Sequence, residues 1–400
     1  MSQTFEWGLS SSNDHRRRPL ARTASDWEAS RLAVSRNQAV DFFRGLGLWM
    51  LFVNHLTPNV WSQLTPAQFG FSDFAEIFVF LSGYVNASMY ERAFQSGGIT
   101  AAVGKLRTRV TKLYIAHIAS MVAGLAILGA FASRGLRLDG SALYVWMGEP
   151  LRYLARALLL LYSPGLFALL PLYLVLSPVA LVAFVALRRW PAWVLTSSFA
   201  LWCIAQSRMV QVMQEAWYFQ PFAWQFLLVL GTASKMYWAD VKRGAESRTL
   251  QRLAIVVVLT SFLLKTAMLI DPVRWWLFRL TPLSAHVLVY NAGKIHLAPL
   301  RLVHFLSLLI LIIAIPCDWQ KWLESRAVRL AIAGGRDSLF IYSVTLVLAV
   351  TLNVLLKGLD AGPRLQFACC ALGLCVICGI ANRRDKLPAR FDLQPKQSRK

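Results

Sequence analysis

Residues 39–57 read AVDFFRGLGLWMLFVNHLT, an apolar run that contains Asp41, Arg44 and His55. An α-helix turns about 100° per residue, so Arg44 and His55 are about three turns apart and lie on one face. Asp41 falls within about 60° of that face, and the three together follow about 20 Å of helix. An ionisable side chain at the centre of a bilayer costs at least about 2.5–3.5 kcal/mol and usually faces a partner or a cavity. The stretch therefore predicts a membrane helix with a polar path along one side.

A simpler interpretation of the same stretch stays open. Asp41 and Arg44 could form a pair one turn apart in the inner headgroup region, with His55 at the outer interface. That interpretation explains each residue alone, but it does not explain why all three share a face.

The composition of the whole chain extends the prediction to a complete membrane protein. Of 400 residues, 56% are hydrophobic and 16% charged, and the mean hydropathy is +0.49. Runs of roughly 17–22 apolar residues recur, which is the length of a helix that crosses a bilayer. These runs are continuous rather than alternating, which indicates helices and not a barrel. We expect an all-α, polytopic helical bundle.

The positions of the charges predict the topology. The net charge is +22, but most Lys and Arg lie in short segments between apolar runs, where they orient a membrane protein, so nucleic acid is not an expected partner. We expect both termini in the cytoplasm, a basic disordered tail at 1–38, a membrane domain at 39–381 and a basic tail at 382–400. The ten expected spans are 39–58, 74–91, 110–131, 166–187, 192–206, 222–238, 250–270, 300–317, 337–356 and 365–381.

The second expected span opens with FGFSDFAEIFVFLSGY at 69–84. Asp73 and Glu76 have the spacing of a helix N-cap and its reciprocal acidic partner. Glu76 also lies at the same outer level as His55, and a carboxylate beside a histidine can orient the ring and stabilise its charged form. We therefore assign a functional role to Glu76.

The third expected span carries a basic stripe at its inner end. Lys105, Arg109 and Lys112 fall within about 40° of one another around the helix. Aligned cations at a cytoplasmic entrance suit a polyphosphate ligand such as the nucleotide of acyl-CoA. His117 lies further into the same span and, as a histidine inside the membrane, is itself a candidate functional residue.

Further polar residues gather near the outer level. WYFQPFAWQFLLVLG at 217–231 contains Trp224 and Gln225, and HLAPLRLVHFLSL at 296–308 contains Arg301 and His304. Polar groups at an outer level and cations at an inner level are the layout of an enzyme that takes a donor from one side and an acceptor from the other. Cys375 and Cys378 form a CxxC without polar neighbours, so we read them as packing residues and expect no metal site.

In combination these stretches resemble the OpgC-type family, within the broader type-three membrane acyltransferases. The likeness rests on VDFFRG at 40–45, the spacing of Arg44 and His55, residues 69–84, KLYIAH at 112–117, and the two outer stretches. It implies an inner-membrane, multi-pass enzyme that passes an acyl group, typically succinyl, from cytoplasmic acyl-CoA to a periplasmic glucan. It further implies that His55 is catalytic and that Arg44 supports donor handling. Asn54 departs from the family, in which an Asp often precedes this histidine.

The resulting hypothesis is an O-acyltransferase without a permanently bound cofactor. The expected roles of its residues form three groups. The catalytic group is His55, Glu76, Arg44 and Asp41; the donor group is Lys105, Arg109, Lys112, Tyr114 and His117; the acceptor group is Asn54, Trp224, Gln225, Arg301 and His304. The alternative is a transporter or exporter of an anionic or glycan solute, although no internal repeat favours it.

Overall fold

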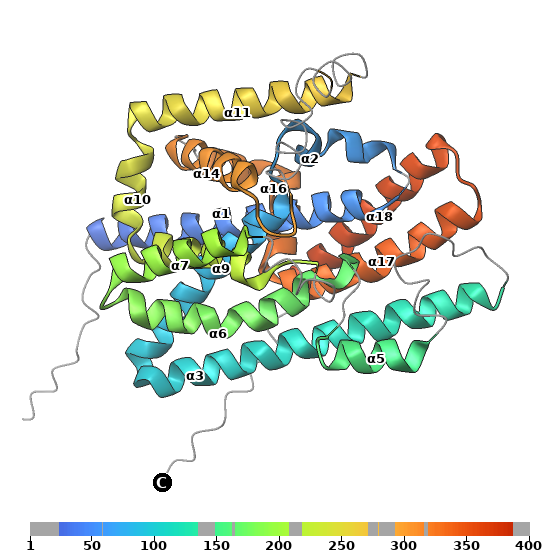
Figure 1. Ribbon diagram of the computed structural model, residues 1–400, viewed down its shortest axis with the longest axis horizontal. Helices are drawn as coiled ribbons and strands as arrows, with labels where there is room; N and C mark the ends of the chain where they lie inside the picture. Colours follow the sequence, from blue (N-terminus) through green and yellow to red (C-terminus); the bar gives the residue numbers. More distant parts are fainter. Residues whose placement is uncertain are drawn as a thin grey trace, which may run out of the picture. The chain divides into compact units, whose positions relative to one another are not determined.

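The fold is known from a computed structural model that describes residues 24–57, 59–134, 149–161, 165–207, 218–270, 279, 293–315 and 319–386 (Figure 1). The chain divides into two units, Met1–Gln38 and Ala39–Lys400. Helix α1 begins at Ala24 in the first unit, and all other helices belong to the second. Residues 1–23 and 387–400, which make up most of the two predicted tails, lie outside the described residues.

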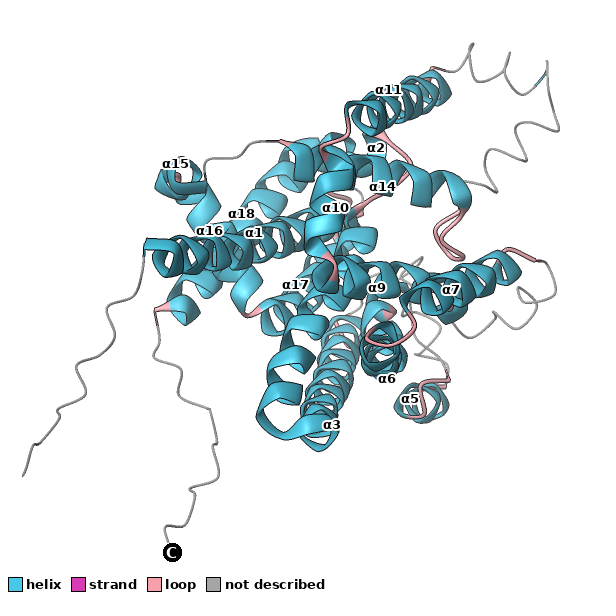
Figure 2. Cartoon of the chain, turned by 90° about the vertical axis from the view of Figure 1, so that its left-hand side faces the viewer, coloured by secondary structure: helices cyan, strands magenta, loops and turns pink. Residues whose placement is uncertain are grey.

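Helices are the only regular elements in the described residues, and this confirms the all-α class (Figure 2). The longer helices are α1 (Ala24–His55), α3 (Phe74–Ala132), α6 (Leu169–Leu187), α7 (Pro191–Ala205), α9 (Pro221–Met236), α11 (Arg248–Leu269), α14 (Pro299–Ala314), α17 (Ser338–Gly358) and α18 (Pro363–Asp385). The shorter ones are α2 (Pro66–Phe69), α5 (Pro150–Leu158), α10 (Trp238–Ala245), α15 (Trp319–Glu324), α16 (Arg326–Arg336) and the 3₁₀ turns η1 (Val60–Leu64) and η2 (Gly165–Phe167).

Length and apolar composition mark some of these helices as able to cross a membrane. Among the described residues, α3, α6, α11, α17 and α18 meet both conditions, and α7 and α14 are shorter apolar helices. Each of the ten predicted spans overlaps a helix. The chain is therefore a helical membrane protein, while the number of ten crossings and the cytoplasmic position of both termini stay predictions.

Helix α3 joins two predicted spans, 74–91 and 110–131, through a kink. Gly97 and Gly98 break its helical geometry, and Gly98 has φ +63°, which glycine adopts without steric cost. We call residues 74–96 the first arm of α3 and residues 99–132 its second arm. The segment 92–109, which lies between these two predicted spans, is helical on both sides of this pair of glycines, because alanine, lysine, arginine and leucine surround them.

Glycines let the first arm of α3 press against α9. A Cβ at Gly83 would collide with the carbonyl of Leu228, and a Cβ at Gly231 would collide with the carbonyl of Phe80. Small residues allow this backbone-to-backbone approach, which is a common basis of helix packing in membranes. The contact sets how far α9 can slide along α3, and so it sets the height of Trp224 at the start of α9.

Close packing at glycines also fixes the position of helix α1. Gly45 lies against the carbonyl of Ala331 in α16, and Gly47 lies under the ring of Phe78 in α3. Because α1 runs opposite to the first arm of α3, the contact at Gly47 brings the end of α1 to the same level as the start of α3. His55 and Glu76 are thereby brought to one end of the bundle.

Candidate active site

The start of α3 carries the first two charges of the site. The Asp73 side chain accepts the backbone N–H of Ala75 at 2.8 Å, and the Glu76 side chain accepts the backbone N–H of Asp73 at 2.9 Å. Together they complete the capping box that the spacing predicted. A capping glutamate is usually exposed, yet Glu76 is 0% exposed, so its charge needs a partner inside the protein.

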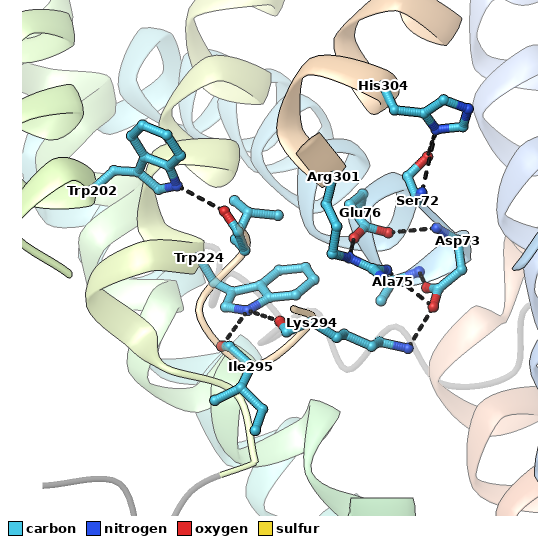
Figure 3. Close-up of polar contacts among 11 residues, drawn as sticks. Ser72, Asp73, Ala75, Glu76, Trp202, Trp224, Lys294, Ile295, Arg301 and His304 are labelled. Atoms are coloured by element: carbon cyan, nitrogen blue, oxygen red, sulfur yellow. Dashed lines mark hydrogen bonds and ion pairs between the residues drawn. The ribbon is translucent and has the colours of Figure 1, made fainter. Parts of the chain in front are cut away.

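Arg301 from α14 is that partner. Its Nε donates to Oε1 of Glu76 at 2.6 Å, and its Nη2 lies 3.2 Å from Oδ2 of Asp73. Lys294 approaches the same Oδ2 atom at 2.7 Å (Figure 3). Two carboxylates and two cations thus form a charge-balanced group, which we call the outer cluster: Asp73, Glu76, Lys294 and Arg301.

The cations of the outer cluster keep Asp73 ionised. Burial by itself would raise the pKa of Asp73, but the Lys294 ammonium and the Arg301 guanidinium outweigh it and hold this pKa well below its usual range. The negative charge at Asp73 is therefore a permanent feature of the site at neutral pH.

His304 lies one turn beyond Arg301 on α14. Its Nδ1 lies 2.6 Å from Ser72 Oγ and also accepts the backbone N–H of Ser72 at 3.3 Å (Figure 3). Since Nδ1 accepts, the ring proton is assigned to Nε2. A Cβ at Gly70 would overlap the His304 ring, so the glycine makes room for the histidine. Arg301 and His304 were both predicted for this site, and the structure brings them to the start of α3.

The turn that carries Lys294 is held by side chains from α7 and α9. Trp224 Nε1 donates to the carbonyls of Lys294 and Ile295 at 3.2 and 3.0 Å, and Trp202 Nε1 donates to the carbonyl of Leu297 at 3.0 Å (Figure 3). Leu297 has φ +47°, an uncommon conformation for a leucine. The tryptophans therefore stabilise a strained turn, and this turn delivers Lys294 to Asp73.

His55 ends α1 beside the outer cluster. Lys294 and Asp73 are near enough for their charges to act on its imidazole. The carbonyl of His55 accepts Asn353 Nδ2 at 2.7 Å, and Asn353 Oδ1 accepts the backbone N–H of Thr57 at 2.7 Å. Asn353 on α17 thus anchors the end of α1 by its backbone, and in the described part of the chain the imidazole itself makes no hydrogen bond.

Glu76 and Asn54, two predicted site residues near His55, have hydrogen-bond partners of their own in the structure. Both carboxylate oxygens of Glu76 are taken by Arg301 and by the backbone of Asp73, so Glu76 does not orient the His55 ring by a direct hydrogen bond. Asn54 is exposed, and its Oδ1 accepts the Thr65 hydroxyl at 2.8 Å. A carboxylate could accept the same bond, so the change from Asp to Asn keeps this contact.

Trp224 and Gln225 were predicted to contact substrate, and both have structural partners instead. Gln225 Nε2 donates to the carbonyl of Ser198 at 2.8 Å, and its Oε1 accepts the Ser198 hydroxyl at 2.7 Å. These bonds join α9 to α7. Trp224 is fully buried behind the 293–298 turn. Their polar atoms face the protein because α7 packs against α9, a contact that the sequence of α9 alone does not reveal.

A second polar group lies further along the same helices. Arg109 Nη2 donates to Ser82 Oγ at 3.0 Å, and Arg44 is near enough for the two guanidinium charges to interact. Tyr173 from α6 lies within electrostatic reach of both. Asp41 lies within electrostatic reach of Arg44, but neither guanidinium forms an ion pair among the described residues. We call this pair, Arg44 and Arg109, the inner arginines.

The remaining predicted donor residues do not join the inner arginines. Lys105 and Lys112 are exposed, and Tyr114 donates from its hydroxyl to the carbonyl of Leu158 in α5 at 3.0 Å. His117 is buried, and the backbone of Ala157 in α5 lies close to its ring. The predicted stripe of cations therefore divides, with Arg109 turned inward and the lysines outward.

Sequence reasoning missed three residues of the site: Ser72, Lys294 and Trp202. Of the three, Lys294 was the easiest to predict, because it is a cation close to the start of the eighth expected span. Within the described residues, no group of three His, Cys, Asp or Glu side chains could hold a metal ion.

The helices and the buried polar groups together describe one class of protein. It is a helical membrane protein with a histidine beside a buried ionic cluster at one end and, deeper in the bundle, two arginines without a carboxylate partner in the described chain. Comparison with known families makes the assignment specific. The chain matches the family described as OpgC protein over residues 36–388, and it belongs to that family. At the level of the family the activity is that of a membrane acyltransferase of glucans. No curated protein and no solved structure matches the chain.

Proposed function

We propose that this protein transfers an acyl group, which we take to be succinyl, from cytoplasmic acyl-CoA to a hydroxyl of a periplasmic glucan or another envelope polysaccharide. We propose further that it lies in the bacterial inner membrane with ten spans and both termini in the cytoplasm. The observation that supports the chemistry best is the position of His55: its imidazole makes no hydrogen bond in the described residues and lies beside the outer cluster.

In this proposal His55 is the general base. Its imidazole takes the proton of a sugar hydroxyl while the hydroxyl oxygen attacks the thioester carbonyl. The new C–O bond forms, the C–S bond breaks, and the proton passes to the departing thiolate, so the products are an ester and free CoA. Direct transfer and an acyl-histidine intermediate are both compatible with this outcome.

The outer cluster would serve the developing charges. Lys294, whose side chain is 30% exposed, would stabilise the negative charge on the thioester oxygen. Asp73 would stabilise the imidazolium that forms at His55. Glu76 and Arg301 would act indirectly. Each neutralises the charge of the other, and together they hold Asp73 and α14 in place.

The inner arginines would hold the donor phosphates. Arg44 lies about 16 Å along α1 from His55. The pantetheine arm of CoA contains two amide units and has the reach of roughly four to five extended residues, about 15 Å. A thioester carbonyl at His55 therefore leaves the phosphates near Arg44 and Arg109, which form no ion pair with a carboxylate in the described residues and suit such a ligand.

The proposal is tested with the purified chain in detergent, succinyl-CoA and a glucan acceptor. We expect free CoA to appear only when acceptor is present, and the acceptor mass to rise by one succinyl group. His55→Ala should abolish both signals while the protein still inserts and unfolds at the wild-type temperature. Normal transfer by His55→Ala would refute the role of His55. A transporter would release no CoA with any acceptor, and that result would refute the enzymatic proposal.

A further inference from the structure

Asn86 in the first arm of α3 is a buried amide without a partner in the described chain. It is 1% exposed, and neither Oδ1 nor Nδ2 has a hydrogen bond in the described residues. Burying an amide in this state costs about 1–3 kcal/mol. An apolar residue would avoid that cost, so an unpaired carboxamide at this position points to a group that joins it from outside the chain.

The surroundings of Asn86 are those of the inner arginines. Ser82, Asn86 and Tyr90 follow one another at intervals of one turn and share a face of the helix. Ser82 accepts the Arg109 guanidinium at 3.0 Å, and the Tyr90 phenol lies within electrostatic reach of the same group. The free carboxamide thus lies between two side chains that both meet Arg109.

The depth of Asn86 follows from the helix rise. Glu91 pairs with Arg188 at 3.1 Å where α6 ends, and both side chains are partly exposed. From that level Asn86 lies about 8 Å along the arm, Ser82 about 14 Å and Glu76 about 22 Å. Asn86 therefore lies about 15 Å inward from Glu76, close to the level of Arg44, which lies about 16 Å inward from His55 along α1.

This depth suits the nucleotide end of a coenzyme A thioester whose acyl carbonyl lies at His55. The acyl carbonyl is followed by the pantetheine arm, then the phosphates, then adenosine. A carbonyl at His55 and phosphates at the inner arginines leave the adenosine beside those phosphates, at the level of Asn86. This inference rests on the function proposed above, because it assumes that the donor is a CoA thioester.

We propose that Asn86 binds the adenine base of the donor, next to a phosphate held by Arg109. A carboxamide offers an acceptor and a donor side by side, and adenine presents the complementary amino group and ring nitrogen. Asparagine pairs with adenine in this bidentate way elsewhere. The site selects a nucleotide-bearing thioester over an acyl group carried on pantetheine alone.

The test uses the full chain in detergent and measures the Kd of two ligands by calorimetry: adenosine 3′,5′-bisphosphate and ribose 5-phosphate. We expect the wild type to bind the adenine ligand about 10- to 100-fold more tightly. Asn86→Leu should remove this preference. Ser88→Ala, a control two residues away whose hydroxyl bonds only its own helix, should retain it.

A second measurement separates binding from a structural role. Asn86→Leu removes an unpaired amide, so the unfolding temperature of the ligand-free protein should not fall. A retained adenine preference in Asn86→Leu, or no preference in the wild type, would overturn the inference. So would weakened binding of pantetheine with unchanged binding of the bisphosphate, because Asn86 would then pair with an amide of the arm.

Turnover is not needed for this titration. A chain that transfers acyl groups but shows no base preference therefore refutes the role of Asn86 and leaves the proposed function standing. A chain that binds the adenine ligand through Asn86 but releases no CoA refutes the proposed function and leaves the role of Asn86 standing.

Discussion

The ion pair between Arg301 and Glu76 provides a quantitative test of the outer cluster. Arg301→Met would leave the Glu76 carboxylate buried without its guanidinium, because the side chains are 9% and 0% exposed. Removing one partner of a buried pair costs about 3–5 kcal/mol. Glu76→Gln should cost less, since Arg301 still has Asp73 at 3.2 Å.

The double variant distinguishes the pair from two independent contacts. When Arg301→Met and Glu76→Gln are combined, neither position carries an uncompensated charge, and such replacements are often close to neutral. We therefore expect the double variant to be more stable than Arg301→Met alone, with a coupling energy of about 2 kcal/mol.

The assay is reversible unfolding in mixed micelles, with the free energy of unfolding measured for the wild type, both single variants and the double variant. The pair Arg188 and Glu91, whose side chains are 40% and 41% exposed, is the matched control, and its coupling should stay below about 1 kcal/mol. Strictly additive effects at Arg301 and Glu76 would refute the buried pair.

Three further predictions follow from single contacts. The pKa of Asp73 in the folded protein lies below its ordinary value, so in acid the folded state binds fewer protons than the unfolded state. The stability that Asp73 contributes is therefore present above about pH 4 and is lost in stronger acid. Asp73→Asn should reduce this loss when the free energy of unfolding is measured against pH. Gly45→Ala should cost about 1–3 kcal/mol of unfolding free energy by overpacking, while Gly379→Ala, which meets nothing within 4 Å, should stabilise by about 0.5–1 kcal/mol; equal effects would contradict the close packing of α1. Trp202→Phe keeps an aromatic side chain but replaces the indole by a smaller phenyl ring and loses the N–H. Transfer should slow about tenfold, and stability should fall by about 1 kcal/mol for the lost hydrogen bond and further for the lost ring volume. A wild-type rate would show that the turn needs no such restraint.

Features determined by a few neighbouring residues were predictable from the sequence. The helical class and the positions of the apolar segments depend on local composition and length. The capping box at Asp73 and Glu76 depends on a spacing of three residues, and it is present as predicted. The kink in α3 was missed, because Gly97 and Gly98 looked like part of a loop and the helix continues on both sides of them.

The site was only partly predictable for a different reason. Charged and aromatic residues such as Glu76, Arg301 and Trp224 could be predicted to lie near one end of a membrane bundle, since their heights follow from their places along each helix. The pairing of Arg301 with Glu76 and the contact of Trp224 with the turn of Lys294 could be seen only in the folded chain. Such partners depend on how far neighbouring helices rotate and slide, and contacts between distant residues, such as Gly83 against Leu228 and Gly47 against Phe78, set those movements.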